Sequence, residues 1–219
     1  MTVQAGPYTV WGEGRGFRVI WLLEELKLPY RLRDVDMLKG VENDPEFLAI
    51  NPGGFIPALQ DGDMVMVESV AILQYLLARH GPTPLALDPA DPAFGTWLQF
   101  LHLGEAGLMG TAFFAWAGRG FGPEHARDDW TAALGLSMFE GRRKLLARQL
   151  DRTPYMAGEA FTAADISVAY ALLWARRTQT AILTSAEQAY IERCIDRDGY
   201  RRAMQVCPGT RGWAEASGG

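Results

Sequence analysis

A turn followed by a hairpin near residue 55 constrains the fold of this chain more than any other feature of its sequence. The segment Asn51-Pro52-Gly53-Gly54-Phe55-Ile56-Pro57-Ala58-Leu59 begins with turn-forming residues and then enters an apolar run whose proline has no amide hydrogen. A proline in a sheet is confined to the first residue of a strand or to an edge. The turn Asp61-Gly62-Asp63 and the apolar run 64–67 complete a predicted hairpin, and a helix is predicted to start at Glu68-Ser69.

The residues around this hairpin offer complementary groups for an amino-acid-like ligand. If the Ile56-Pro57 bond is cis, the amide and carbonyl of Ile56 can turn outward and pair with an extended peptide. Glu68 can bind a ligand ammonium, whereas Ser69 and the unpaired amides of the first helical turn suit a carboxylate. The alternative is a plain hairpin in which Glu68 and Ser69 only cap the next helix.

A second motif is the segment Phe161-Thr162-Ala163-Ala164-Asp165-Ile166. Thr162 has the residue type of a helix N-cap, and Asp165 stands three residues later, where an acid can accept a hydrogen bond from the N-cap amide. Phe161 and Ile166 flank this pair as a hydrophobic staple. The segment therefore predicts the start of a helix with a capping box.

Both motifs resemble those of the cytosolic glutathione transferases. The N-P-x-G-x-I-P turn with the following Glu-Ser is similar to the family's glutathione site, the second motif is similar to the folding motif of its helical domain, and the likeness extends over nearly the whole chain. It implies that glutathione is the co-substrate and that the backbone of Ile56, before cis-Pro57, pairs with its cysteinyl part. It also implies that Glu68 and Ser69 hold the γ-glutamyl end. Lys39, on the loop before a short helix, is a further candidate for the glycine carboxylate.

The spacing of apolar residues predicts alternating strands and helices first and helices alone afterwards. The first part has the order βαβαββα, which is thioredoxin-like, and proline-rich punctuation separates it from the helical part. The predicted fold is an α/β thioredoxin-like glutathione-binding domain at 1–81, a linker at 82–92 and an all-α domain at 93–219. The predicted strands are 8–11, 30–36, 56–60 and 64–67. The predicted helices are 15–27, 45–50, 69–80, 93–116, 123–150, 162–178 and 185–197.

Composition and charge exclude several classes of partner. The chain has 219 residues, 48% of them apolar, which is enough to bury a core in one large or two small domains. Its formal net charge of −5 and its dispersed basic residues indicate no nucleic-acid partner. No apolar run approaches the roughly 20 residues that span a bilayer, so no membrane partner is expected and the predicted location is cytoplasmic. Cys194 and Cys207 form no CxxC pair and indicate thiols in a reducing compartment, with a late disulfide as the alternative.

The predicted helix 93–116 is apolar around most of its circumference. Such a helix needs cover from its own core, a partner subunit or an apolar ligand. The family resemblance implies that helices in this region line a pocket for a hydrophobic electrophile and form a homodimer interface, with Met109, Phe113 and Phe114 as pocket candidates. An ordinary core helix is the alternative. No metal is expected, because His80, His102, His125 and the two cysteines lack the spacing of metal ligands.

The loop Gly12-Glu13-Gly14-Arg15-Gly16 supports a rival interpretation. A strand, a glycine-rich turn, a helix and a second strand ending in Asp34 or Asp36 resemble the opening of a dinucleotide-binding fold. The pattern fails at Phe17, where the third glycine would be needed for close helix packing, and the chain then continues into the proline hairpin. The sequence therefore favours the thioredoxin-like interpretation.

The same loop departs from the family pattern, because residues 11–16 contain no tyrosine, serine or cysteine to act on the glutathione sulfur. A free thiol has a pKa of roughly 8.5, so useful ionisation near neutrality requires a shift of ~2 units, on the order of 2.7 kcal/mol. One charged hydrogen bond contributes roughly 1.5–3 kcal/mol. Arg15 and the Trp11 indole N–H are therefore the candidate catalytic groups, together with the bare amides of the loop. Alternatively, Arg15 is a solvated helix-start residue and Trp11 only packs.

The sequence thus predicts a two-domain glutathione transferase-like enzyme that conjugates glutathione thiolate to apolar electrophiles. The missing cysteine in residues 11–16 argues against the family's thiol-exchange branches. The alternative function is a glutathione-binding interaction or stress-response module that keeps the fold and has little or no turnover.

Overall fold

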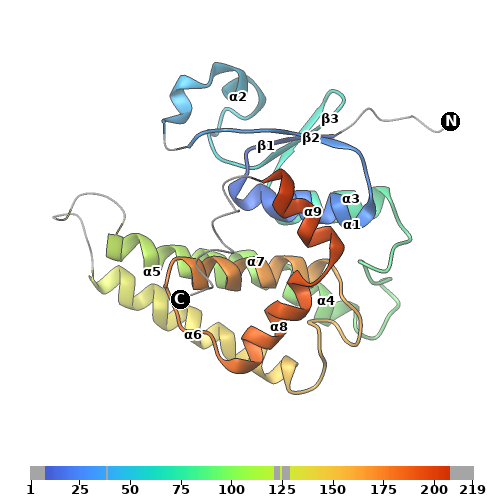
Figure 1. Cartoon of the computed structure of the whole chain (residues 1–219), viewed down its shortest axis with the longest axis vertical. Coiled ribbons are helices and arrows are strands. Elements are labelled where there is room, and N and C mark those ends of the chain that lie inside the picture. Colours follow the sequence, from blue (N-terminus) through green and yellow to red (C-terminus); the bar gives the residue numbers. More distant parts are fainter. Residues whose placement is uncertain (1–7, 38, 121–123, 125–128, 208–219) are drawn as a thin grey trace. The chain divides into compact units, whose positions relative to one another are not determined.

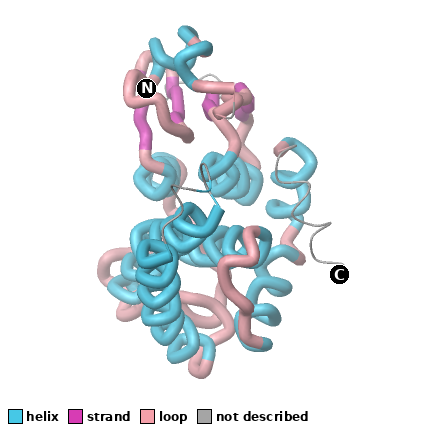
Figure 2. The backbone as a smooth tube through the Cα atoms, turned by 90° about the vertical axis from the view of Figure 1, so that its left-hand side faces the viewer, coloured by secondary structure: helices cyan, strands magenta, loops and turns pink. Residues whose placement is uncertain are grey.

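The computed structural model describes residues 8–37, 39–120, 124 and 129–207 (Figure 1). These residues divide into two compact units. The first contains the described residues up to Gly81 together with those from Arg197 onward, and the second is Pro82–Asp196. All described strands lie in the first unit, and the second is helical (Figure 2).

The first unit is built on a four-stranded sheet in the order β2-β1-β3-β4. Strands β1 and β2 are parallel, whereas β3 is antiparallel to both β1 and β4. The strands are β1 (Tyr8–Trp11), β2 (Tyr30–Arg33), β3 (Ala58–Asp61) and β4 (Met64–Val67), and the helices are α1 (Phe17–Leu26), α2 (Pro45–Ile50) and α3 (Ser69–Arg79). This confirms the thioredoxin-like order βαβαββα. The antiparallel hairpin also excludes the dinucleotide-binding alternative, which requires a parallel sheet.

Several predicted elements of this unit begin or end differently. β2 ends at Arg33, whereas the predicted strand ran to residue 36. β3 starts at Ala58, after the proline, because Pro57 cannot donate to a neighbouring strand. The first predicted helix, 15–27, is a short 3-10 turn (η1, Gly14–Gly16) followed by α1. α1 ends at Lys27, whose left-handed φ of 55° closes the helix.

A C-terminal helix, α9 (Asp198–Val206), belongs to the first unit and lies beside α1 (Figure 1). Arg197 binds Glu25 at 2.7 Å and Arg202 binds Glu24 at 2.7 Å. The Tyr200 ring packs on Trp21 of α1 with a centroid separation of 4.9 Å. The predicted helix 185–197 is α8 (Ser185–Ile195), which ends two residues earlier, before an extended Arg197; the sequence did not predict α9, which starts after this residue.

The second unit consists of helices. They are α4 (Phe94–His102), the π-helix η3 (Leu103–Met109), α5 (Gly110–Gly120), α6 (Asp129–Leu150), α7 (Ala163–Arg177) and α8. The predicted helix 93–116 is thus α4, η3 and α5 in series and extends to Gly120, whereas the predicted start of the next helix at 123 lies outside the described residues. Gly104 allows η3 to approach α7, since a Cβ there would lie 2.5 Å from the Ser167 carbonyl carbon.

The capping box at the start of α7 is confirmed. Asp165 is completely buried, and its carboxylate accepts hydrogen bonds from the Thr162 amide at 2.8 Å, the Met156 amide at 2.8 Å and the Tyr190 hydroxyl at 3.0 Å. Burial outweighs these bonds and raises the pKa of Asp165 to about 6.

The raised pKa of Asp165 predicts a pH dependence of stability. The unfolded carboxyl has a pKa of 3.8, so between about pH 4 and 6 the folded protein keeps a proton that the unfolded chain has released. The contribution of Asp165 to the free energy of unfolding is therefore present below pH 4 and is lost as the pH rises to about 6, by roughly 3 kcal/mol. Asp165→Asn is expected to lack this dependence.

Urea unfolding at several values between pH 4 and 7 measures the effect. The difference in unfolding free energy between wild type and Asp165→Asn should change across this window, whereas Asp151→Asn, at an exposed carboxylate, should run parallel to wild type. If the unfolding free energies of Asp165→Asn and wild type ran parallel across this pH range, the pKa of Asp165 would not be raised in the folded protein.

Candidate functional site

Three strand ends meet at one edge of the sheet in the first unit. Trp11, at the end of β1, pairs with Ala58, at the start of β3, and Ala58 pairs with Val67, at the end of β4. Because paired residues are neighbours, the residues just beyond them, Gly12, Pro57 and Glu68, lie along the same edge. The prolyl corner and the start of α3 are therefore brought together, as the sequence predicted, and the glycine-rich loop lies beside them.

The glycine-rich loop packs directly on the prolyl corner. The Ile56-Pro57 peptide bond is cis. A Cβ at Gly12 would overlap the Ile56 side chain, and a Cβ at Gly16 would lie 3.3 Å from the Pro57 Cβ. Glycines therefore occupy this loop because it must contact the corner closely, and because Gly12 has a φ of 82°.

The turn before the corner is held by Asn51. Its buried side chain donates to the Phe55 carbonyl at 2.6 Å and accepts from the Gly53 amide at 3.0 Å. Within the described residues, the amide and carbonyl of Ile56 form no backbone-to-backbone hydrogen bond. These two groups have the donor and acceptor character that an extended peptide needs.

Glu68 and Ser69 start α3 with unusual backbone geometry. Glu68 has φ 70° and ψ 102°, a left-handed conformation that costs a residue with a side chain on the order of 1 kcal/mol or more. Its side chain is exposed, whereas Ser69 is buried. Arg18 of α1, also completely buried, donates from Nη1 to the Ser69 Oγ at 3.2 Å. The N-terminus of α3 thus presents the Glu68 carboxylate at the surface, next to the buried Ser69 hydroxyl, which is hydrogen-bonded to Arg18.

Trp11 and Arg15 have different surroundings. Trp11 is 5% exposed, stacks on Phe47 with a centroid separation of 6.3 Å, and lies under the Arg33 guanidinium at 5.5 Å. Its indole N–H is buried and has no hydrogen-bond partner among the described residues. Arg15 lies in η1, between two glycines that pack on the corner. Trp11 is therefore a core residue whose indole N–H is available to a ligand. Arg15, by contrast, belongs to the glycine-rich loop.

Lys39 lies on the loop before α2 and is exposed. Its Nζ is 3.1 Å from the Asp36 carboxylate. It lines a cavity of about 520 Å³ whose other charged residues are mostly acidic. These are Asp34, Asp36, Asp44, Glu46 and Arg33. A ligand carboxylate at Lys39 would have to compete with Asp36 for the ammonium group.

The apolar candidates of the second unit differ in exposure. Met109, in η3, is only 2% exposed and belongs to the core. Phe113 and Phe114 of α5 are 36% and 57% exposed. The Phe113 ring packs on Trp116 at 5.8 Å, between ring centroids, and on Trp174 of α7 at 6.3 Å. Phe113 and Phe114 therefore offer aromatic surface, whereas Met109 is buried and offers almost none.

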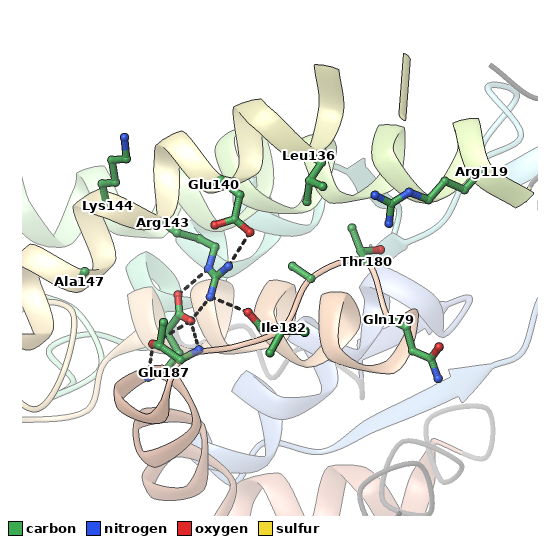
Figure 3. Close-up of a pocket in the computed structure, with 12 residues that line it drawn as sticks. Arg119, Leu136, Glu140, Arg143, Lys144, Ala147, Gln179, Thr180, Ile182 and Glu187 are labelled. Atoms are coloured by element: carbon green, nitrogen blue, oxygen red, sulfur yellow. Dashed lines mark hydrogen bonds and ion pairs between the residues drawn. The ribbon is translucent and has the colours of Figure 1, made fainter. Parts of the chain in front are cut away.

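A separate cavity of about 690 Å³ lies in the second unit between α6 and the segment that joins α7 to α8 (Figure 3). Arg143 fixes its wall: Nε donates to Glu187 at 2.8 Å, Nη1 to Glu140 at 2.6 Å and Nη2 to the Ile182 carbonyl at 3.0 Å. The buried charge is thus neutralised inside the protein, which is typical of a structural ion pair. None of the predicted site residues lines this cavity.

The described part of the chain contains neither a group of metal-ligating side chains nor a helix that could span a membrane. Across residues 8–37, 39–120, 124 and 129–207, no three His, Cys, Asp or Glu side chains are grouped to hold a metal ion. None of the helices described is both long enough and apolar enough to cross a bilayer. His125, one of the residues whose spacing in the sequence does not suit metal ligands, lies outside the described residues.

Sequence reasoning missed Arg18 and Glu13. Glu13 is 8% exposed, in the loop between β1 and α1. Arg18 interrupts an otherwise apolar run, Phe17–Leu23, every residue of which is buried. A cation inside a helix that is buried on all sides signals a specific polar contact, because burying an unpaired charge is costly.

A thioredoxin-like unit with a cis-prolyl corner, followed by a helical unit, defines a class of two-part thioredoxin-fold proteins. Residues 4–78 match the family model described as the N-terminal domain of glutathione S-transferase. Glutathione S-transferase GstB of Escherichia coli strain K12 is 30% identical over 172 residues, which cover 74% of this chain and 79% of that protein. The chain therefore belongs to the glutathione S-transferase family.

Solved structures agree with the fold. A glutathione transferase from Phanerochaete chrysosporium, in complex with oxidized glutathione, has a TM-score of 0.79 at 23% identity and covers 99% of this chain and 100% of its own. A theta class enzyme from Xanthomonas axonopodis pv. citri, with glutathione bound, has a TM-score of 0.73 at 25% identity, over 90% of this chain and 96% of its own.

Proposed function

We propose that this protein is a glutathione transferase that joins the glutathione sulfur to an apolar electrophile. The observation that carries the proposal is the register of Trp11, Ala58 and Val67, which places the glycine-rich loop, the Ile56-Pro57 corner and Glu68-Ser69 along one sheet edge. Family membership and the glutathione found in related structures support the same ligand.

Each part of glutathione has a candidate partner. Glu68 binds the γ-glutamyl ammonium, and Ser69 with the first amides of α3 binds its carboxylate. The backbone of Ile56 pairs with the cysteinyl residue, and Pro57 keeps this corner in place. Lys39 remains the candidate for the glycine carboxylate.

The reaction is a nucleophilic displacement or addition. The thiol loses its proton, and the thiolate attacks an electrophilic carbon. A carbon–sulfur bond forms while a leaving group departs with its electron pair, or while an electron pair moves onto the electrophile. Arg15 stabilises the thiolate as a fixed cation, and the Trp11 indole N–H is the second candidate donor. Phe113 and Phe114 are the proposed contacts for the apolar electrophile, with the buried Met109 as a further candidate.

We also propose a homodimer and a cytoplasmic location. Exposed apolar side chains that recur every fourth residue of α6 support the dimer, because exposed apolar surface of this kind is typical of an interface. They are Trp130, Leu134 and Met138. Light scattering should give the mass of two chains.

Cys194 and Cys207 form no disulfide within the described residues, as expected in a reducing compartment. The domain limits 1–81 and 93–219, with a linker at 82–92, likewise remain proposals.

Two measurements on the purified chain test the function. Titration calorimetry with S-methylglutathione should detect binding, and mixing glutathione with 1-chloro-2,4-dinitrobenzene should release chloride as the conjugate forms. Binding without conjugation of this or other aryl and alkyl halides would favour the alternative, a glutathione-binding interaction or stress-response module. A folded chain that takes up neither glutathione nor its S-methyl derivative would overturn both.

A further inference from the structure

A buried arginine stands directly behind the proposed γ-glutamyl site. Arg18 lies in the first turn of α1 and is completely buried, and its Nη1 donates to the Oγ of Ser69, the first residue of α3, at 3.2 Å. The two residues are 51 positions apart, so the contact depends on the packing of α1 against α3.

This contact determines what the Ser69 hydroxyl can do for a ligand. A hydroxyl has one hydrogen to donate and two lone pairs to accept with, whereas a guanidinium can only donate. Since Ser69 accepts from Arg18, its own hydrogen must point elsewhere. Ser69 is therefore set as a donor, which suits a carboxylate oxygen and disfavours an ammonium group.

Arg18 also adds positive potential where an anion is expected. The N-termini of α1 and α3 each carry about half a positive charge, so a cation there is placed against both helix dipoles. In a buried setting the potential of a guanidinium is screened less than at the surface. A carboxylate bound at the start of α3 would therefore lie in the positive potential of Arg18 and of the two helix N-termini.

We propose that Arg18 is a positioning residue, which orients the Ser69 hydroxyl and thereby selects the carboxylate of the γ-glutamyl group. The inference rests on the proposed function, because it assumes that glutathione occupies this site. It predicts that Arg18 controls affinity only for ligands that carry this carboxylate. A residue that merely stabilised the fold would affect all ligands of the site alike.

Two ligands separate these roles. One is S-methylglutathione, and the other is its analogue with γ-aminobutyrate in place of γ-glutamate, which keeps the ammonium and lacks the carboxylate. Arg18→Met should weaken binding of S-methylglutathione about 10- to 100-fold, as expected for one charge-assisted hydrogen bond. Binding of the analogue, measured by competition, should change less than twofold. Arg18→Lys, which keeps the charge, should retain part of the affinity for S-methylglutathione.

A second comparison needs no analogue. Because Arg18 acts through Ser69, the losses caused by Arg18→Met and Ser69→Ala should be less than additive in the double variant. Arg143→Met, at another buried arginine, is the matched control, expected to lower thermal stability and leave the affinity of the folded protein unchanged. If Arg18→Met does not fold, Arg18→Lys carries both comparisons.

The outcomes distinguish this inference from the proposed function. If wild type binds neither ligand, the proposed function is wrong. If wild type binds S-methylglutathione and the folded Arg18 variants bind it equally well, Arg18 has no such role. Equal losses for both ligands, or additive losses with Ser69→Ala, would also overturn the inference.

Discussion

Glu68→Gly is expected to lose glutathione binding while folding more stably than Glu68→Ala. Both variants remove the carboxylate that we assign to the γ-glutamyl ammonium, a charge-assisted contact that contributes about 1.5–3 kcal/mol, or roughly 10- to 150-fold in affinity. They differ in the backbone, because residue 68 has a φ of 70°. Glycine adopts this conformation without the Cβ penalty that alanine keeps, so the two variants should differ in stability by about 1 kcal/mol.

Retention on immobilised glutathione and urea unfolding measure the two effects. Neither Glu68 variant should be retained, whereas Asp63→Asn, at an exposed carboxylate in the turn of the same hairpin, should bind like wild type. Glu68→Gln keeps the shape of the side chain and removes its charge, and this variant should likewise not be retained on immobilised glutathione. Unchanged retention of Glu68→Ala would refute the assigned role, and equal stability of the Gly and Ala variants would show that the φ of residue 68 carries no strain.

The parts of the fold that were predicted correctly depend on local signals. The prolines and glycines of 51–57 specify a turn and a strand start, and Thr162 with Asp165 specifies a helix start, because these residues act within a few positions of themselves. The parts that were missed depend on distant contacts. α9 is separate from α8, and ion pairs from Arg197 and Arg202 hold it on α1. No local pattern reveals such partners.

The candidate site divides in the same way. Ile56, Glu68 and Ser69 could be proposed as site residues from their order along the chain, and strand pairing brings their surroundings to one edge. Arg18 could not, since its bond to Ser69 spans 51 positions. Trp11 shows a further limit, because the sequence gives it a donor without revealing that the ring packs on Phe47. Helix and strand patterns place a side chain on a face, whereas the partners of its polar atoms depend on packing.

Arg15→Ala is expected to raise the pH at which glutathione becomes reactive. A fixed cation near the sulfur stabilises the thiolate and lowers the thiol pKa, so its removal should raise that pKa. A loss of about 1.5–3 kcal/mol corresponds to roughly 1–2 pH units. The acid limb of kcat/KM for glutathione should move upward by this amount. Conjugation near pH 6.5 should then fall about 10- to 100-fold, and the difference should shrink as the pH exceeds the thiol pKa of roughly 8.5.

The competing donor is tested in parallel by Trp11→Phe, which removes the indole N–H and keeps an aromatic ring against Phe47. If Arg15 is the activating group, the pH profile of Trp11→Phe should match wild type while its stability falls by about 1 kcal/mol for the smaller core ring. Arg31→Ala, at an exposed arginine of β2, controls for the loss of one positive charge. If neither Arg15→Ala nor Trp11→Phe moves the acid limb, the thiolate is stabilised by the amides of the Gly12–Gly16 loop or by the helix that follows it, because these donors remain in both variants.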